Sequence, residues 1–192
     1  SKQVLFRAAL ENDYRPVMKL YTVDLEGHEP AALPLPKGAQ GAFSPDGAKL
    51  LYNPKGNEDY YWKRYKGGQY AEVWLADLKA KRYAKLTDYV GKNAYPMWTA
   101  EGKALFVSDR DNGVSNLYAL DLETKAAKPL TRYEDFDVQW PSTDGRTVVY
   151  AQGGYLAALD LATGQAKRLD LKVSTDAWKT APRTVNPKDW IQ

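Results

Sequence analysis

The chain has 192 residues, of which 44% are apolar, so it can form a hydrophobic core and is not an intrinsically disordered protein. Its 27 basic and 24 acidic residues leave a formal charge of +3, too small to predict nucleic-acid binding. The chain has no cysteine, which excludes disulfides, thiolate metal sites and a cysteine nucleophile. No apolar run approaches the roughly 18–20 residues of a membrane span. No signal peptide opens the chain, and the localisation stays open between periplasm and cytoplasm.

A motif of the form Leu-aromatic-x-x-Asp-Leu, typical of a β-strand, recurs along the chain. Its four copies span residues 20–25, 73–78, 117–122 and 156–161. The aspartates of successive copies are 53, 44 and 39 residues apart. One four-stranded propeller blade needs about 40–45 residues, so each copy predicts one blade.

Other strands of the same unit surround this motif. An acidic-Gly turn precedes it at residues 43–47 and 98–102, and again at 140–145 with one extra residue, so that Trp140 takes the place of Trp98. Asp-Gly and Glu-Gly supply the positive φ that a tight hairpin turn needs. Further strands are predicted at 49–52, 104–107 and 147–150 before the motif, and at 82–87, 127–131 and 166–169 after it.

The predicted fold is therefore all-β, a partial β-propeller of about four blades with four antiparallel strands each. The propeller spans residues 1–172, and the approximate blades are 4–38, 39–92, 93–135 and 136–172. The first blade begins at a second strand, residues 4–10, and lacks its first. Residues 173–192 fit no blade and are predicted to be a linker toward a following domain. Since propellers close with four to eight blades, we expect a longer parent protein.

An incomplete ring has consequences for association. Its end blades would expose faces lined with large apolar residues. We therefore expect either a homodimer that buries these open blade faces or poor solubility. The remaining domains of the parent protein, or another protein, are the other expected partners.

Two resemblances refine this prediction. Residues 95–98, 106–111, 116–118 and 129–131 resemble the TolB-type (PD40, WD40-like) propeller repeat. Residues 53–54 and 61–68 resemble a segment of the N-terminal six-bladed propeller of tricorn-like serine peptidases, and residues 181–186 and 190–192 resemble the passage from that propeller into the second one. That second resemblance implies a non-catalytic part of a large peptidase that trims short peptides, whose nucleophile lies in C-terminal domains. The propeller would be a scaffold, access channel and substrate filter; the alternative is a TolB-like protein–protein interaction module.

The insertion at residues 55–70 carries the candidate binding site. Three cations alternate there with three aromatic residues: Tyr61, Trp62, Lys63, Arg64, Tyr65 and Lys66. Cations beside aromatic faces could bind the carboxylate and side chains of a short peptide. The alternative is a long hairpin whose aromatic rings pack on the sheet and whose cations stay solvated.

No catalytic residue, metal site or cofactor is predicted. The only histidine, His28, lies in a turn, and no Gly-x-Ser-x-Gly motif accompanies it. Residues 109–113 resemble a calcium loop, but position 12 of that pattern would be Leu120, so a hairpin turn is the better interpretation. The basic run at 79–82 is predicted to be a solvated sheet edge.

Overall fold

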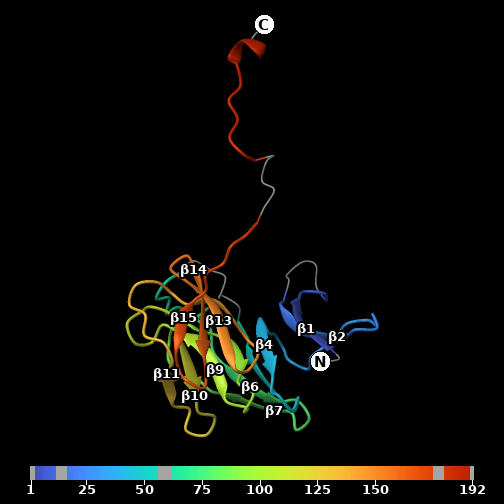
Figure 1. Cartoon of the computed structure of the whole chain (residues 1–192). Helices are drawn as coiled ribbons and strands as arrows, with labels where there is room; N and C mark the ends of the chain where they lie inside the picture. The colour runs from blue at the N-terminus through green and yellow to red at the C-terminus, as the bar shows by residue number, and fades with distance from the viewer. Residues whose placement is uncertain (1–2, 12–16, 56–61, 175–179, 191–192) are drawn as a thin grey trace.

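Four antiparallel sheets follow one another along the chain in a computed structural model, which describes residues 3–11, 17–55, 62–174 and 180–190 (Figure 1). We name the sheets blades 1 to 4. Their strands are β1 (Gln3–Ala8), β2 (Lys19–Asp24) and β3 (Ala31–Ala32) in blade 1; β4 (Gln40–Phe43), β5 (Lys49–Asn53), β6 (Trp74–Asp77) and β7 (Arg82–Lys85) in blade 2; β8 (Asn93–Trp98), β9 (Ala104–Ser108), β10 (Asn116–Leu120) and β11 (Ala127–Pro129) in blade 3; and β12 (Gln139–Thr143), β13 (Thr147–Gln152), β14 (Tyr155–Asp160) and β15 (Ala166–Arg168) in blade 4.

The strands of each blade pair in sequence order, so every sheet is a simple meander. Blades 2, 3 and 4 have four strands, whereas blade 1 has three in its described residues. The β1–β2 pair aligns with the second and third strands of the other blades, because Asp24 ends β2 as Asp77 ends β6. The predicted all-β, four-bladed propeller arrangement is confirmed.

The aspartate at the end of each third strand fixes the turn that follows. Oδ1 of Asp121 accepts hydrogen bonds from the backbone N–H groups of Glu123 (3.0 Å) and Thr124 (2.7 Å). Asp160 makes the same pair of bonds with Ala162 and Thr163. These Asx turns explain the aspartate of the motif, since its side chain satisfies backbone donors as the chain reverses.

Neighbouring blades pack face to face through apolar side chains. The interface between blades 3 and 4 contains Leu105, Leu117, Val148, Tyr150 and Leu159, each at most 2% exposed. Two similar clusters join blade 2 to blade 3 and blade 1 to blade 2. The hydrophobic core therefore lies between the sheets, as expected when both faces of a sheet are covered.

The innermost strands of blades 3 and 4 carry matching β-bulges that sequence alignment missed. The register shifts between Ala94 and Met97 in β8 and between Gln139 and Ser142 in β12. The bulged residues Tyr95 and Trp140 have φ angles of 55° and 47°. Trp140 therefore corresponds to Tyr95, and the predicted alignment with Trp98 is wrong. The turn is one residue shorter in blade 4, because five residues separate the paired Trp98 and Ala104 and four separate the paired Thr143 and Val148, so spacing from the turn gave the wrong register.

After β15 the chain leaves the sheets (Figure 1). Its described residues there form no strand and include one short 3₁₀-helix, η2 (Pro187–Asp189). Among the residues that the structure describes, no helix is long and apolar enough to span a membrane.

Candidate functional site

An open cavity lies where the innermost strands of blades 2 to 4 approach one another. Strands β4, β8 and β12, together with β1, border a volume of about 710 Å³. Its wall includes the aromatic side chains of Phe43, Tyr95 and Trp98. This volume is within the range of about 300–1,000 Å³ that is typical of ligand sites.

Two hydrogen bonds between blades 2 and 3 fix this wall. The indole Nε1 of Trp98 donates to the backbone oxygen of Ala42 at 2.8 Å. The backbone N–H of Tyr95 donates to Oε1 of Gln40 at 2.9 Å. Because Tyr95 lies in the β8 bulge, the bulge turns its N–H away from the ladder and toward the neighbouring blade. No pattern in the sequence indicates this contact.

The cavity lining carries charges of both signs. Arg7 on β1 and Asp144 in the β12–β13 turn both border it. Backbone N–H groups of Thr147 (2.7 Å) and Arg146 (2.8 Å) donate to Asp144, and these bonds lower the pKa of its carboxyl group. Ser142 also lines the cavity, but His28 is not among the described lining residues. The arrangement suits binding of a polar chain with apolar side groups.

The predicted binding segment lies in the long loop between β5 and β6. Tyr61 is outside the described residues, while Trp62, Lys63, Arg64 and Lys66 are exposed and Tyr65 is half-buried. The rings of Trp62 and Tyr65 lie 4.8 Å apart between centroids. Described residues 62–73 form no strand, so the hairpin expected as the alternative is not formed there.

In the described part of this loop, Lys63 and Arg64 contact residues of blade 3 and of the segment before blade 4, and neither lines the cavity. Nζ of Lys63 lies 3.4 Å from Oδ2 of Asp137, which immediately precedes blade 4. The Arg64 side chain lies against Gly113, where an added Cβ would be 2.5 Å from Nε of Arg64. Residues 109–113 form the predicted turn, closed by a 3.0 Å hydrogen bond from Gly113 N–H to Asp109 oxygen. The five candidate residues that the structure describes therefore lie outside the cavity between β1, β4, β8 and β12.

A cluster at the base of the loop anchors it to blade 2. Nζ of Lys55 donates to the backbone oxygen of Gly68 at 2.7 Å and lies 5.4 Å from the ring centre of Tyr70. Lys85 lies on the same ring at 5.8 Å and pairs with Glu72 at 2.7 Å. The hydrogen bond to Glu72 raises the pKa of Lys85. Both lysines therefore make contacts that hold the base of the loop on blade 2.

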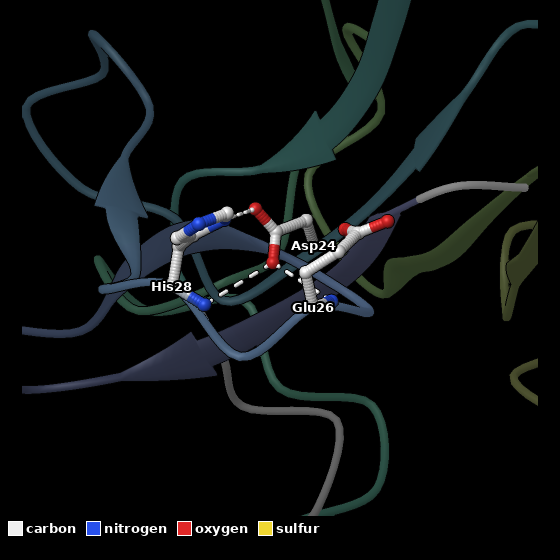
Figure 2. A group of neighbouring side chains, drawn as sticks. All are labelled: Asp24, Glu26 and His28. Carbon is white, nitrogen blue, oxygen red and sulfur yellow. Dashed lines mark hydrogen bonds and ion pairs between the residues drawn. The ribbon is translucent and has the colours of Figure 1, made fainter.

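Asp24, Glu26 and His28 gather at the β2–β3 turn, and their ligand atoms lie within 4.8 Å of one another (Figure 2). The Asp24 carboxylate contacts Nδ1 of His28 at 2.5 Å and accepts from the N–H of Glu26 at 3.0 Å. The bond with His28 lowers the pKa of Asp24. Since Asp121 forms the same kind of turn without a histidine, the backbone contact of Asp24 is that of the repeat, and we assign no metal site.

Comparisons with known proteins agree with this architecture. Residues 1–165 match the family described as the Tricorn protease N-terminal beta propeller domain. A tricorn protease homolog of Saccharolobus solfataricus is 32% identical over 130 residues, covering 68% of this chain and 12% of the relative. Tricorn protease homolog 1 of Streptomyces coelicolor is 31% identical over 144 residues, covering 74% of this chain and 13% of the relative. The chain thus spans about an eighth of these relatives.

Solved structures are similar in fold. TolB from Acinetobacter baumannii superposes with a TM-score of 0.65 and 24% identity, over 90% of this chain and 42% of TolB. The tricorn protease crystal structure gives a TM-score of 0.53 and 18% identity, over 91% of this chain and 22% of that one. The resemblance to TolB and tricorn propellers is confirmed, and with the match over residues 1–165 the chain belongs to the Tricorn protease N-terminal β-propeller domain family.

Proposed function

We propose that this chain is a non-catalytic propeller segment of a tricorn-type peptidase, and that its open cavity is part of a path that admits and filters peptides. The cavity of about 710 Å³ between β1, β4, β8 and β12 is the observation that carries the proposal. Its lining combines aromatic rings with polar and charged groups, a combination that suits short peptides.

The position of the innermost strands adds a second reason. Strands β4, β8 and β12 are the edge strands of their sheets, and all three border the cavity. Edge strands present backbone N–H and C=O groups that an extended peptide can pair with. Contacts of this type depend little on side chains, so the path would accept many sequences and exclude folded chains.

Occluding the cavity tests this function. Ser142 is an exposed residue of its lining, and Ser142→Trp would place an indole inside the cavity. Lys128→Trp adds the same ring to β11, on the outer strand of blade 3, and is the control. With fluorescein-labelled pentapeptides of mixed sequence, we expect Ser142→Trp to weaken binding at least tenfold and Lys128→Trp to leave it unchanged. Equal affinities for both variants would refute the cavity as the binding site.

The β5–β6 loop is proposed as a second peptide contact. Trp62, Arg64 and Lys66 are exposed on it and could contact a peptide carboxylate and an apolar side chain. Arg64→Ala should weaken binding of short anionic peptides, and unchanged affinity would remove the loop from the site. Binding of a folded protein partner that Ser142→Trp does not impair would instead favour the TolB-like interaction module.

A further inference from the structure

Arg110 places its cation among three aromatic rings at the contact between blades 2 and 3. Its guanidinium carbon is 5.0 Å from the ring centre of Phe106, 5.2 Å from that of Tyr118 and 5.5 Å from that of Tyr89. All three distances are within the roughly 6 Å of a cation–π contact. Among the residues that the structure describes, no carboxylate oxygen lies within 4.0 Å of its nitrogens. We call Tyr89, Phe106 and Tyr118 the aromatic box.

Two walls of the aromatic box belong to the hydrophobic core. Phe106 and Tyr118 are at most 1% exposed and are part of the cluster that joins blade 2 to blade 3. They are cross-strand neighbours on β9 and β10, with ring centres 5.7 Å apart. Tyr89, in the β7–β8 loop, is half-buried, and its hydroxyl donates to the backbone oxygen of Asp109 at 3.3 Å. The box therefore has two fixed walls in the core and a third wall on a loop.

Hydrogen bonds fix the orientation of the guanidinium inside the box. Nε of Arg110 donates to Oγ of Ser108 at 3.1 Å, and Nη2 donates to Oδ1 of Asn93 at 3.0 Å. Both acceptor residues are fully buried. Arg110 itself is half-buried, and this burial lowers the pKa of its guanidinium. Because arginine keeps its charge in proteins, a cation partly removed from water is stabilised here by ring faces and neutral acceptors.

The cation and its rings occur together in blade 3 and are both missing from blade 4. Strand pairing makes Tyr150 and Ala157 the equivalents of Phe106 and Tyr118. Blade 4 thus lacks one wall of the box. Its β13–β14 turn has only the two glycines at 153–154 between the paired strand ends, so it has no cation either. This difference indicates that the arginine and the rings form one unit.

The same arginine belongs to the turn that supports the candidate binding loop. Residues 109–113 form this turn, which is closed by the hydrogen bond from Gly113 N–H to Asp109 oxygen. Oδ1 of Asp109 also accepts from the N–H of Lys92 at 2.9 Å. The Arg64 side chain lies against Gly113. The side chain of Arg110 therefore fastens to the core the turn on which Arg64 lies.

We infer that the aromatic box is a guanidinium-binding site that the chain occupies with its own Arg110, and that this internal ligand positions the turn against which Arg64 lies. Guanidinium ions stack on aromatic faces and donate hydrogen bonds in their own plane, the two kinds of contact present here. Once the Arg110 side chain is removed, the box should bind a free guanidinium ion. The inference is independent of the proposed peptide path, since neither the box nor the turn lines the open cavity.

Chemical rescue tests the binding site. Arg110→Ala removes the atoms of N-ethylguanidinium, so this ion is the matched ligand. We expect millimolar N-ethylguanidinium to raise the unfolding temperature of Arg110→Ala saturably, by about 5 °C, because it binds only the folded chain. If Arg110→Ala is unfolded on its own, the ion should restore a cooperative unfolding transition.

Two controls accompany the rescue, at matched ionic strength. N-ethylurea has the same shape without the charge and should not stabilise Arg110→Ala. Arg82→Ala removes an exposed guanidinium from β7 and should not respond to N-ethylguanidinium, and neither should the unmodified chain. The inference is overturned if N-ethylguanidinium has no effect on Arg110→Ala, or if N-ethylurea stabilises this variant equally.

Hydrogen exchange measured by mass spectrometry tests the positioning role with Arg110 in place. Tyr89→Leu removes the half-buried wall of the box, and we expect faster exchange in residues 109–113 with unchanged exchange in β13. Tyr83→Leu, at an exposed tyrosine of the outer strand β7, is the control and should leave both segments unchanged. Unchanged protection of residues 109–113 in Tyr89→Leu, or an equal increase of exchange in both segments, would overturn the local role of the box.

Discussion

The ammonium group of Lys63 lies 3.4 Å from the carboxylate of Asp137, although the first residue belongs to blade 2 and the second precedes blade 4. The other oxygen of Asp137 accepts a 2.8 Å hydrogen bond from the backbone N–H of Ser115, in the β9–β10 loop. Asp137 therefore joins the connections of three blades on one face of the propeller. The hydrogen bond from Ser115 to Asp137 stabilises the fold more than the ion pair with Lys63, because Ser115 is buried and Lys63 is exposed.

Substitutions at this junction should have unequal effects. Asp137→Ala leaves the Ser115 N–H without its acceptor and should lower the free energy of unfolding by about 1–3 kcal/mol. Lys63→Ala removes only an exposed ion pair and should cost less than about 1 kcal/mol. Urea denaturation of both variants, with Asp137→Asn as the variant that keeps an acceptor oxygen, measures the difference. Equal losses for the two alanine variants would contradict it.

Asn93 is predicted to be one of the most sensitive polar positions. It is fully buried, its Nδ2 donates to the backbone oxygens of Tyr89 (2.9 Å) and Ala71 (3.1 Å), and its Oδ1 accepts from Arg110 at 3.0 Å. Asn93→Ala leaves these buried groups without hydrogen-bond partners and should lower the free energy of unfolding by about 3 kcal/mol or more.

Asn112 is the matched control for Asn93. It is exposed, in the β9–β10 loop, so Asn112→Ala should cost about 1 kcal/mol or less. Denaturant midpoints of the two variants give the comparison. A loss below about 1 kcal/mol for Asn93→Ala would show that the buried network does not stabilise the fold as argued.

Gly145 should tolerate alanine less well than Gly164. Both have positive φ, 91° and 70°. A Cβ at Gly145 would lie 2.8 Å from the backbone nitrogen of Ala100, but a Cβ at Gly164 meets nothing within 4 Å. Both variants carry backbone strain, and Gly145→Ala should cost about 1 kcal/mol more because backbone atoms of another blade must move. Thermal unfolding checks this; a Gly164→Ala variant that is as destabilised would contradict it.

The turn aspartates should make the fold sensitive to acid. Backbone hydrogen bonds, the first from Thr124 for Asp121 and from Thr163 for Asp160, lower the pKa of both carboxyl groups. A lowered pKa in the folded state means that the stabilisation is present above the unfolded pKa of about 3.9 and is lost as pH falls through the folded value.

Asparagine variants test this pH dependence. Asp160→Asn keeps an acceptor oxygen but does not titrate, so its stability should fall less between pH 5 and pH 2 than that of the unmodified chain. Urea midpoints across that interval measure the effect. Parallel curves for both proteins would mean that Asp160 contributes nothing to the acid sensitivity.

The repeat was readable from sequence because one blade needs similar residues at similar spacing. The motif around Asp121 predicted β10, and the strand predicted at 104–107 is β9 to within one residue. The contact of Lys63 with Asp137 could not be read, because the two residues are a whole blade apart and exposed charges have no periodicity. The bulge at Tyr95 was equally hidden, since strand alternation does not encode an added residue.

Photo-crosslinking of a bound peptide tests most directly whether the open cavity is a peptide path. A pentapeptide with a central benzoyl-phenylalanine would be irradiated with the chain, and the modified residues identified by mass spectrometry. We predict modification at lining residues such as Met97 and Trp98 in β8 and Pro141 in β12, lost with Ser142→Trp. Modification confined to the outer strands β7, β11 and β15 would contradict the proposed path.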